Sequence, residues 1–323
     1  MRSSVIAGCG AALPERRVSN AKLAETLDTS DDWIYQRSGI RERRVADQEE
    51  KTSDLAIAAA QSALRRAGMV ASDIDLVIVA TATPDQTVPA TAAFVHARLG
   101  MNHGAAFDVQ AGCSGFIYAL SIADSMIKIG QVKTALVIGA ETLSRILDWS
   151  DRSSCVLFGD GAGAVILRTA DSQELHEARG ILSTHLHSDG RHHDKIFTDG
   201  GPSSTGTTGR VHLNGREVFL HAVTNLATVA EEALVANGLT CADIDWLIPH
   251  QANQRIIETL AMKIRLPLEK VIMTIDHHAN TSAASIPLAM EEALTSGSIR
   301  DGDLVLMAAM GAGFTWGSAL VRW

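Results

Sequence analysis

The sequence has few cysteines, no long apolar run and no surplus of positive charge. Its 4 cysteines are spread over 323 residues without Cys-x-x-Cys spacing, which favours a reduced compartment, the cytoplasm, and argues against a zinc motif. No apolar run reaches the roughly 18 residues that a membrane span needs. A net charge of −9 argues against a general nucleic-acid binder. An acidic partner would therefore need a local basic patch.

What is present is the composition of a large globular protein. Hydrophobic residues make up 46% of the chain and charged residues 20%, and this length allows a sizeable core and about two domains. The apolar run 5–13 is broken by glycine and followed by Pro14-Glu15-Arg16-Arg17. It is interpreted as a first strand, with a signal peptide as the alternative.

An internal repeat organises the chain. Segment 60–78 aligns with segment 230–248 without gaps, and both copies predict a helix ending at a glycine, a short loop and an apolar strand. The two segments lie 170 residues apart, and this spacing is called the repeat offset below. It holds over about 80 residues and indicates duplicated domains rather than a solenoid. Alternating strands and helices predict two α/β halves with covered sheets. The expected domains are an N-terminal half, 1–172, and a C-terminal half, 173–323.

Cys113 lies where a strand is expected to turn into a helix. Segment 105–109 predicts a short buried strand, and apolar residues recur at helical spacing over 116–129. Free backbone N–H groups and the positive end of the helix dipole then lie beside the sulfur, and this setting lowers a thiol pKa. Cys113 is therefore a candidate nucleophile. The alternative is a small buried cysteine that packs at a helix start.

Polar residues in the second half follow expected strands, where sites form in α/β sheets. His250 comes just after the strand 246–248. The repeat offset makes the turn at Asn280 equivalent to the Cys113 turn. A glycine loop, 311–313, follows a further strand. These side chains are expected to face one another across a pseudo-twofold axis.

Two other motifs suggest sites that their context does not support. Gly-Asp-Gly-Ala-Gly at 159–163 resembles a phosphate loop, but it precedes the strand 164–167 rather than a helix, so it is assigned to a tight turn lining the pocket. A group of histidines and aspartates suggests a metal site, yet its spacing matches no standard site and its surroundings indicate a loop. The group comprises His185, His187, Asp189, His192, His193 and Asp194.

Tracts along the whole chain carry a resemblance to a known family. They are 29–34, 37–43, 158–164, 183–187, 249–253, 280–287 and 313–317. In this order and spacing they resemble the β-ketoacyl-[acyl-carrier-protein] synthase III family of the thiolase-like superfamily. The resemblance implies a thiolase-like fold of two α/β halves stacked as α-β-α-β-α layers. It also implies an acyltransferase that condenses a short acyl-CoA, usually acetyl-CoA, with malonyl-acyl carrier protein to start fatty acid biosynthesis.

The resemblance implies a role for each candidate. Cys113 is expected to be the nucleophile, with its own N–H and that of Ala312 as the oxyanion hole. His250 and Asn280 are expected to bind the enolate oxygen of decarboxylated malonyl through a neutral imidazole N–H and an amide NH₂. No metal and no cofactor are expected, because the CoA thioester is a substrate. No cysteine follows Cys241, which favours decarboxylation over the proton abstraction of degradative thiolases.

The resemblance also implies binding residues and partners. The expected CoA-binding residues are Trp33, Arg37, Arg152 and Asn253. The expected carrier-protein docking residues are Gln251, Arg255 and Lys263, helped by Arg265 and Arg216. Val88 and Met310 are expected at the acyl pocket, Val88 by reaching into the partner subunit. The partners are thus an acyl-CoA, malonyl-acyl carrier protein and a second copy of the chain in a homodimer, with no nucleic acid and no membrane.

Several residues depart from the family pattern. Ala279 and Ala312 stand where glycine is usual, and a methyl group beside Asn280 restricts backbone angles that glycine permits. Leu220 replaces a common lysine, and Val88 and Met310 replace common phenylalanines. These departures leave open a specialised condensing enzyme that uses longer acyl-CoA or malonyl-CoA in secondary metabolism. A cysteine hydrolase and a non-catalytic scaffold are the alternatives from other classes.

Overall fold

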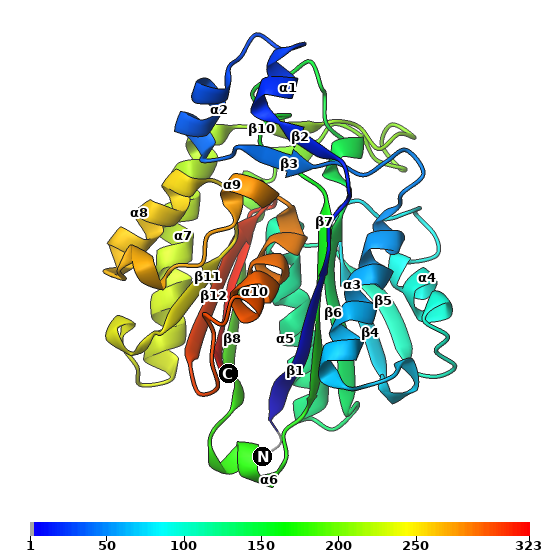
Figure 1. Ribbon diagram of the computed structural model, residues 1–323, viewed down its shortest axis with the longest axis vertical. Helices are drawn as coiled ribbons and strands as arrows, with labels where there is room; N and C mark the ends of the chain where they lie inside the picture. The colour runs from blue at the N-terminus through cyan, green and yellow to red at the C-terminus, as the bar shows by residue number, and fades with distance from the viewer. Residues whose placement is uncertain (1–2) are drawn as a thin grey trace.

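A computed structural model describes residues 3–323. Two mixed sheets form its frame, with helices between them and on both outer faces (Figure 1). The five-stranded sheet has the order β1 (Ser4–Ala12), β7 (Gly161–Thr169), β6 (Thr134–Glu141), β4 (Leu76–Ala80) and β5 (Ala105–Val109). The four-stranded sheet has the order β11 (Trp246–Pro249), β12 (Leu304–Gly311), β13 (Thr315–Arg322) and β8 (Gly180–Ser188).

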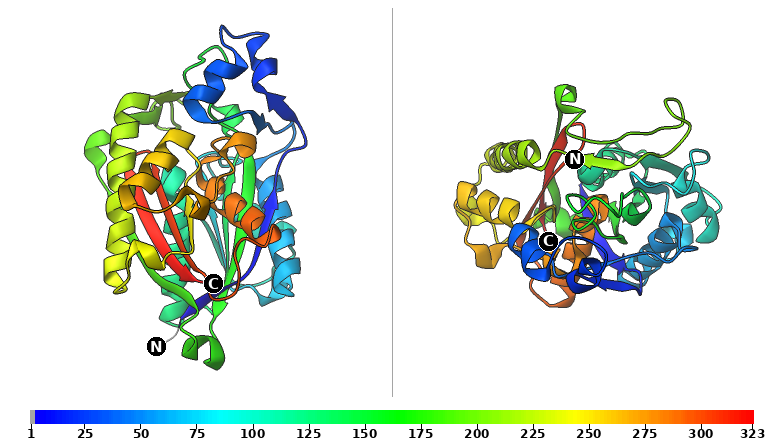
Figure 2. Two further views of the ribbon diagram at one scale, coloured as in Figure 1. Left: turned by 60° about the vertical axis from the view of Figure 1, so that its left-hand side comes forward. Right: turned by 90° about the horizontal axis from the view of Figure 1, so that it is seen from above.

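The helices form three layers around the two sheets, as the views in Figure 2 show. Helices α3 (Thr52–Ala67) and α4 (Thr91–Arg98) cover the outer face of the first sheet. Helices α5 (Gly115–Lys128) and α10 (Ser285–Thr295) lie between the sheets, and α7 (Gly215–Ala236) and α8 (Gln254–Ile264) cover the second. The predicted α-β-α-β-α thiolase-like arrangement is therefore confirmed.

Smaller elements gather at one end of the molecule and form a cap, visible at the top of Figure 1. The cap contains β2 (Arg17–Ser19), α1 (Asn20–Ala24), α2 (Asp31–Ser38), β3 (Glu42–Arg44), β9 (Ile196–Thr198) and β10 (Val211–Leu213). The remaining short helices are α6 (Ser172–His176), which joins the two halves, and α9 (Ile275–His278). The 3₁₀ turns are η1 (Ala71–Asp73), η2 (Gly112–Ser114), η3 (Leu143–Arg145), η4 (Gly190–His192), η5 (Cys241–Asp243), η6 (Leu268–Lys270) and η7 (Ser282–Ala284).

A fully buried arginine ties the cap to the rest of the molecule. The guanidinium group of Arg43 on β3 donates to the Val18 carbonyl at 3.0 Å, to Asn20 Oδ1 at 2.9 Å and to the Val156 carbonyl at 2.8 Å. A buried cation needs partners for its donors, and among residues 3–323 the Arg43 Nε–H has none while the terminal nitrogens are paired. The cap is thus held in place over the segment that leads to Phe158.

The predicted duplication is confirmed element by element. The repeat offset places η1 on η5, η2 on η7 and β6 on β12. Gly68 and Gly238 both follow their helices with positive φ, +64° and +67°, which is the left-handed conformation that glycine adopts at a helix end. Each half builds its own sheet, from residues up to Thr169 and from Gly180 onward, while the domain boundary between 172 and 173 stays a prediction.

The two central helices explain why the core forms here. Phe116, Leu120 and Ile127 recur at helical spacing on α5 and are fully buried. Strand β6 is buried along nearly its whole length, as expected for a strand covered on both faces. The strand β5 was expected to be buried as well, and this was wrong, because β5 lies at the sheet edge and Ala105 is exposed.

Helix α7 is long and mostly apolar. By length and composition alone it is the one helix among residues 3–323 that could cross a membrane, although charged residues interrupt its apolar sequence. In the fold it packs against β12 and β13, and Leu226, Ala230 and Ala233 on that face are buried. An apolar helix face packed on a sheet is the normal arrangement of a core helix.

Two interpretations of loops are also wrong. Gly161 and Gly163 belong to β7 rather than to a turn lining the pocket, and Asp160 before them is buried. His185 and His187 lie on β8 rather than in a loop, and both face Glu232 of α7, at 3.3 and 2.6 Å. Neither motif contributes to the cavity that holds Cys113.

Candidate active site

One cavity of about 140 Å³ is lined by all three predicted catalytic residues, Cys113, His250 and Asn280. Cys113 belongs to η2 before α5, His250 follows β11, and Asn280 follows α9. The two halves of the fold therefore contribute to one site between them. Its remaining lining is mostly apolar and comes from four regions of the second half and the 157–158 segment. The apolar residues are Leu157, Phe158, Ile196, Leu213, Val218, Phe219, Ala222, Leu226, Ala252, Ile256 and Met310.

Cys113 occupies the predicted place, but the predicted direction of its pKa is wrong. The residue is partly exposed and stands at the start of α5. Burial raises the pKa of the Cys113 thiol to about 11, although contact with the Ser282 hydroxyl lowers it. Loss of hydration destabilises the thiolate more than the N-terminus of the helix stabilises it.

The two backbone segments that carry the predicted oxyanion-hole donors lie against each other. A Cβ built on Gly311 would lie 2.4 Å from the Cys113 N atom, and one on Gly112 would lie 2.9 Å from the Ala312 N atom. Thr315 fixes the two segments together, because its hydroxyl donates to the Ala111 carbonyl at 2.8 Å. The backbone at Cys113 and the backbone at Ala312 are thus neighbours, which an oxyanion hole built from both N–H groups requires. Their catalytic role stays a prediction.

His250 is held as a neutral imidazole. It is buried, and burial lowers the pKa of His250 to about 3. Its Nδ1 atom lies 2.7 Å from Ser285 Oγ, and the Gln251 N–H donates to the same Oγ at 3.3 Å. The Ser285 oxygen accepts from the Gln251 N–H, and the Ser285 hydroxyl can donate to Nδ1 of His250. This arrangement pairs all three groups and assigns the ring proton of His250 to Nε2. The imidazole then presents a neutral N–H donor.

Asn280 is oriented by the turn that follows it. The Ser282 N–H donates to Asn280 Oδ1 at 2.9 Å, which assigns the free NH₂ group to the cavity side. The preceding Ala279 has φ +57° and ψ −162°, a region that only glycine adopts without strain. The departure from glycine at this position therefore stores strain beside a candidate catalytic residue.

The predicted CoA-binding residues gather at the edge of the cap. The guanidinium carbon of Arg37 lies 4.3 Å from the centre of the Trp33 ring, and that of Arg152 lies 5.2 Å from it. Asn253, which lines the cavity, donates through Nδ2 to the Arg37 carbonyl at 2.8 Å. Arg152 also pairs with Asp28 at 3.1 Å. Both guanidinium groups therefore already lie near the indole on which an adenine ring is expected to stack.

One predicted docking residue is wrong. Gln251 is 1% exposed, so its side chain cannot contact a carrier protein. Its amide donates to the Pro249 and Ile272 carbonyls at 2.8 and 3.2 Å and accepts from the Thr274 N–H at 2.9 Å. Gln251 thus fixes the chain that carries His250.

The other docking candidates are exposed. Arg255 and Lys263 lie on the outer side of α8, with Arg265 just after it and Arg216 at the start of α7. Leu220, where a lysine was noted as missing, is 60% exposed on α7. The basic residues on this face can attract an acidic protein, and their docking role stays a prediction.

The two acyl-pocket candidates lie apart. Met310 is 5% exposed and lines the cavity, where its sulfur lies 3.6 Å from Asn225 Nδ2. Val88 is 78% exposed on a loop and does not line the cavity of its own chain. Its expected contact is with a partner subunit, and that expectation stays a prediction.

Within residues 3–323, one cluster of side chains has the spacing of metal ligands. His277, His278 and Glu292 bring their ligand atoms within 4.8 Å of one another. His277 lies 2.7 Å from Asp276 and 2.8 Å from Glu292, and these carboxylates raise the pKa of His277 to about 10. At neutral pH a proton on His277 thus already balances the carboxylates, and a metal ion would have to displace it.

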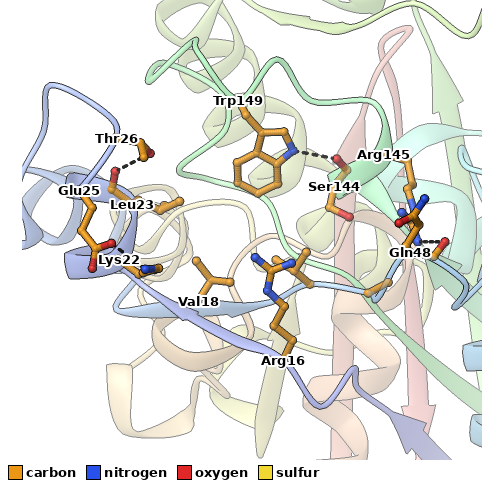
Figure 3. Close-up of a pocket in the computed structure, with 12 residues that line it drawn as sticks. Arg16, Val18, Lys22, Leu23, Glu25, Thr26, Gln48, Ser144, Arg145 and Trp149 are labelled. Atoms are coloured by element: carbon orange, nitrogen blue, oxygen red, sulfur yellow. Dashed lines mark hydrogen bonds and ion pairs between the residues drawn. The ribbon is translucent and has the colours of Figure 1, made fainter.

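A second recess, of about 690 Å³, is lined by residues of the cap and of the segment 144–149 (Figure 3), and its lining contains none of the three catalytic candidates. Two of the three cationic residues that line it are already engaged. Lys22 pairs with Glu25 at 2.6 Å, and the guanidinium group of Arg145 donates to backbone carbonyls of the loop 47–50. The indole N–H of Trp149 donates to a backbone carbonyl at 3.1 Å. These contacts tie parts of its wall together, and none of the three catalytic candidates lines it.

Sequence reasoning missed three residues that surround the nucleophile and the imidazole. Ser285 fixes the tautomer of His250, and Ser282 contacts the Cys113 thiol. Both stand in the tract 280–287, so that tract carried a signal for them. Glu141, at the end of β6, is fully buried and raises the pKa of Cys113 by its charge. In the sequence, Glu141 stands out only as an acidic residue at the end of an apolar strand.

Comparison with known proteins gives consistent matches over the whole chain. Residues 107–190 match the family model for 3-oxoacyl-[acyl-carrier-protein] synthase III, and residues 234–323 match the model for its C-terminal part. Proteins named β-ketoacyl-[acyl-carrier-protein] synthase III are 65% identical in Paramagnetospirillum magneticum, over 100% of this chain and 99% of that protein, and 63% identical in Rhodospirillum centenum, over 99% of each.

Solved structures match as well. The 3-oxoacyl-[acyl-carrier-protein] synthase III of Aquifex aeolicus has a TM-score of 0.94 at 45% identity, covering 99% of this chain and 100% of that one. The corresponding protein of Pseudomonas aeruginosa has a TM-score of 0.93 at 42% identity, covering 100% of this chain and 98% of that one.

Proposed function

The chain belongs to the β-ketoacyl-[acyl-carrier-protein] synthase III family, and we propose that it condenses the short acyl group of an acyl-CoA with malonyl-acyl carrier protein. Acetyl-CoA is the expected donor, and the reaction starts a fatty acid. The observation that carries the proposal is the single cavity lined by Cys113, His250 and Asn280. A nucleophile, a neutral donor and an amide donor at one place are what a decarboxylative condensation requires.

The first half-reaction transfers the acyl group to Cys113. The sulfur attacks the thioester carbonyl, and the N–H groups of Cys113 and Ala312 stabilise the negative charge on its oxygen. The bond from the acyl carbon to the CoA sulfur then breaks, and CoA leaves as a thiol after taking up a proton. The product is an acyl thioester on Cys113.

The second half-reaction takes place at the residues of the second half. The malonyl thioester oxygen accepts hydrogen bonds from His250 Nε2–H and the Asn280 NH₂ group, which stabilise the enolate as CO₂ departs. The enolate carbon attacks the acyl carbon on Cys113, and the carbon–sulfur bond breaks. The β-ketoacyl chain leaves on the carrier protein, and the sulfur regains a proton. His250 remains neutral throughout, which agrees with its low pKa.

The approach of each substrate follows from the surface around the cavity. The nucleotide end of CoA binds at Trp33, Arg37 and Arg152, and Asn253 lies between this group and the cavity. The acidic carrier protein docks on Arg255 and Lys263 of α8, because opposite charges guide association. No other cofactor and no metal ion takes part in the proposal.

The chain acts as a homodimer in the cytoplasm. Supporting the dimer, β5 pairs with β4 on one side and with no strand of residues 3–323 on the other, and exposed strand edges of this kind are commonly covered. Supporting the location, the 4 cysteines are all free. Light scattering on the purified chain measures the mass of the particle and tests the dimer.

A panel of acyl-CoA donors, each incubated with malonyl-acyl carrier protein, tests the proposal. Mass spectrometry should detect a β-ketoacyl carrier protein that is largest for acetyl-CoA and an acyl adduct on Cys113. Release of free acid in place of this product would indicate a hydrolase, and absence of an adduct would indicate a scaffold. A second arm replaces malonyl-acyl carrier protein by malonyl-CoA. Efficient use of malonyl-CoA or of longer donors would favour the specialised synthase, which the relatives at 63–65% identity do not support.

A further inference from the structure

The two segments that carry the predicted oxyanion-hole donors are in contact, but no backbone hydrogen bond joins them. The turn 111–114 carries Cys113, and the loop 311–315 carries Ala312. A Cβ built on Gly311 would lie 2.4 Å from the Cys113 N atom, so the two backbones approach closely. Among residues 3–323, no backbone N–H of either segment donates to a carbonyl of the other. Side chains must therefore fix the position of one segment against the other.

The hydroxyl of Thr315 makes this link. Its Oγ1 atom lies 2.8 Å from the Ala111 carbonyl oxygen of the first half and 2.9 Å from the Ala312 carbonyl oxygen of the second half. The Ser114 hydroxyl donates to Thr315 Oγ1 at 2.8 Å. Among residues 3–323, every hydrogen bond between the turn and the loop includes the Thr315 hydroxyl.

The two hydroxyls form a chain that crosses between the segments twice. Ser114 of the turn donates to Thr315 of the loop, and Thr315 donates back to the Ala111 carbonyl of the turn. Ser114 is fully buried and Thr315 is partly buried. Hydrogen bonds that are shielded from water are stronger and reinforce one another along a chain. This chain can therefore fix the spacing between the two segments.

The second half lacks this hydroxyl at its equivalent turn. The repeat offset pairs Ser114 of η2 with Ala284 of η7. It also pairs Cys113 with Ala283, so the turn without the serine is the turn without the nucleophile. The two copies form the same kind of turn, and the fold of that turn therefore does not require the serine. The hydroxyl accompanies the sulfur, which connects it with the reaction.

We propose that Thr315, supported by Ser114, holds the backbone N–H groups of Cys113 and Ala312 at the spacing that one oxyanion requires. The inference rests on the proposed function. Negative charge develops on the thioester oxygen as the sulfur attacks the carbonyl carbon, and donors that are already in place stabilise it without reorganisation. Thr315 does not line the cavity, so it is a positioning residue that acts through the two backbone segments.

Two reactions of the same sulfur separate this role from a merely structural one. Acylation by acetyl-CoA passes through an oxyanion, whereas alkylation by iodoacetamide is an attack on a saturated carbon and forms none. Thr315→Val keeps the shape of the side chain and removes the hydroxyl. The maximal rate of acylation should fall by about 10²-fold, the usual effect of a misplaced catalytic group. The alkylation rate and the half-saturating concentration of acetyl-CoA should not change, because the lost interaction acts only in the transition state.

Three further variants sharpen the test. Thr315→Ser restores the hydroxyl and should recover most of the acylation rate. Ser114→Ala removes one neutral hydrogen bond and should slow acylation about fivefold. Thr184→Val is the matched control, because Thr184 Oγ1 lies 2.8 Å from Ser121 Oγ in a hydroxyl pair that joins β8 to α5, and its loss should leave acylation unchanged. Mass spectrometry of the full chain under single-turnover conditions measures both reactions.

Three results would overturn the inference. They are acylation at the wild-type rate in Thr315→Val, acylation as slow in Thr315→Ser as in Thr315→Val, and a parallel fall of acylation and alkylation in Thr315→Val. If circular dichroism shows that Thr315→Val does not fold, Ser114→Ala decides, because a wild-type acylation rate in that variant also contradicts the inference. A wild-type chain that is alkylated at Cys113 but never acylated would instead refute the proposed function.

Discussion

The two halves of the molecule place the same turn at the mouth of the same helix, yet only one of them carries a nucleophile. In the first half η2 leads into α5, and in the second half η7 leads into α10. Gly112 and Ser282 occupy equivalent positions and have φ of +51° and +50°. The next residue is Cys113 in one half and Ala283 in the other. The backbone therefore provides two equal frames, and the side chains decide the chemistry.

Equivalent positions in the two halves have exchanged their roles. The repeat offset pairs His250 with Ala80, and Glu141 with Gly311. The first half thus combines a thiol with a buried carboxyl whose pKa lies near 7, and the second combines a carboxamide with an imidazole whose pKa lies near 3. One half can exchange a proton at neutral pH, and the other can only donate hydrogen bonds. In the proposed mechanism the acyl transfer uses the nucleophile of the first half, and the decarboxylation uses the hydrogen-bond donors of the second half.

The largest expected effect comes from making the first turn resemble the second. Cys113→Ala reproduces the residue found at Ala283 and should reduce condensation by more than about 10⁴-fold, because no nucleophile remains. Decarboxylation of malonyl-acyl carrier protein should continue, since its donors belong to the second half. Product and CO₂ are measured in parallel. Retained condensation would refute the assignment of the nucleophile.

A smaller loss should follow from giving Gly311 a side chain. In Gly311→Ala the new Cβ would lie 2.4 Å from the Cys113 N atom, so the oxyanion hole must open. Acylation by acetyl-CoA should fall by about 10²–10³-fold, the usual effect of losing one such donor. Single-turnover acylation measures it. Gly190→Ala is the matched control, because nothing lies within 4 Å of a Cβ at that position. Equal rates in both variants would contradict the assignment of the oxyanion hole.

The sequence predicted most of what depends on local pattern and on the repeat. The apolar spacing of α5, the glycine stops and the repeat offset all appear in the fold. They also led to the prediction that Cys113 and Asn280 lie at equivalent turns. A pattern of this kind survives folding because each half repeats the same contacts between strand and helix.

What the sequence could not predict is how far each side chain is removed from water. Gln251 follows His250 and was expected at the surface, but three backbone partners keep it buried. The helix start was expected to acidify Cys113, but packing by the other half removes the thiol from water and raises its pKa. Both errors depend on contacts between segments that are distant in the sequence, which local spacing does not encode.

A change in stability rather than rate should follow from Ala279→Gly. Ala279 has φ +57° and ψ −162°, and relief of that strain should raise the free energy of unfolding by about 1 kcal/mol after the cost of glycine flexibility. Urea denaturation measures the difference. Ala178→Gly, at an exposed residue with φ +54°, is the control for positive φ away from the site. A loss of stability in Ala279→Gly would show that the alanine fits its conformation without strain.

The smallest expected effect concerns the rate of decarboxylation, which depends on the second half and should hardly change with pH. With the pKa of His250 lowered by burial to about 3, decarboxylation by Cys113→Ala should change less than about twofold between pH 5.5 and 8. Stability behaves differently over the same window. The unfolded chain protonates its histidine below about pH 6.5 and the folded chain does not, so the free energy of unfolding falls as pH falls from about 6.5 toward 3. Rates are therefore normalised to the folded fraction, measured by circular dichroism. A decarboxylation rate that titrates with a midpoint between pH 6 and 7 would mean that His250 takes up a proton in the reaction, and the contrast between the two halves would no longer hold.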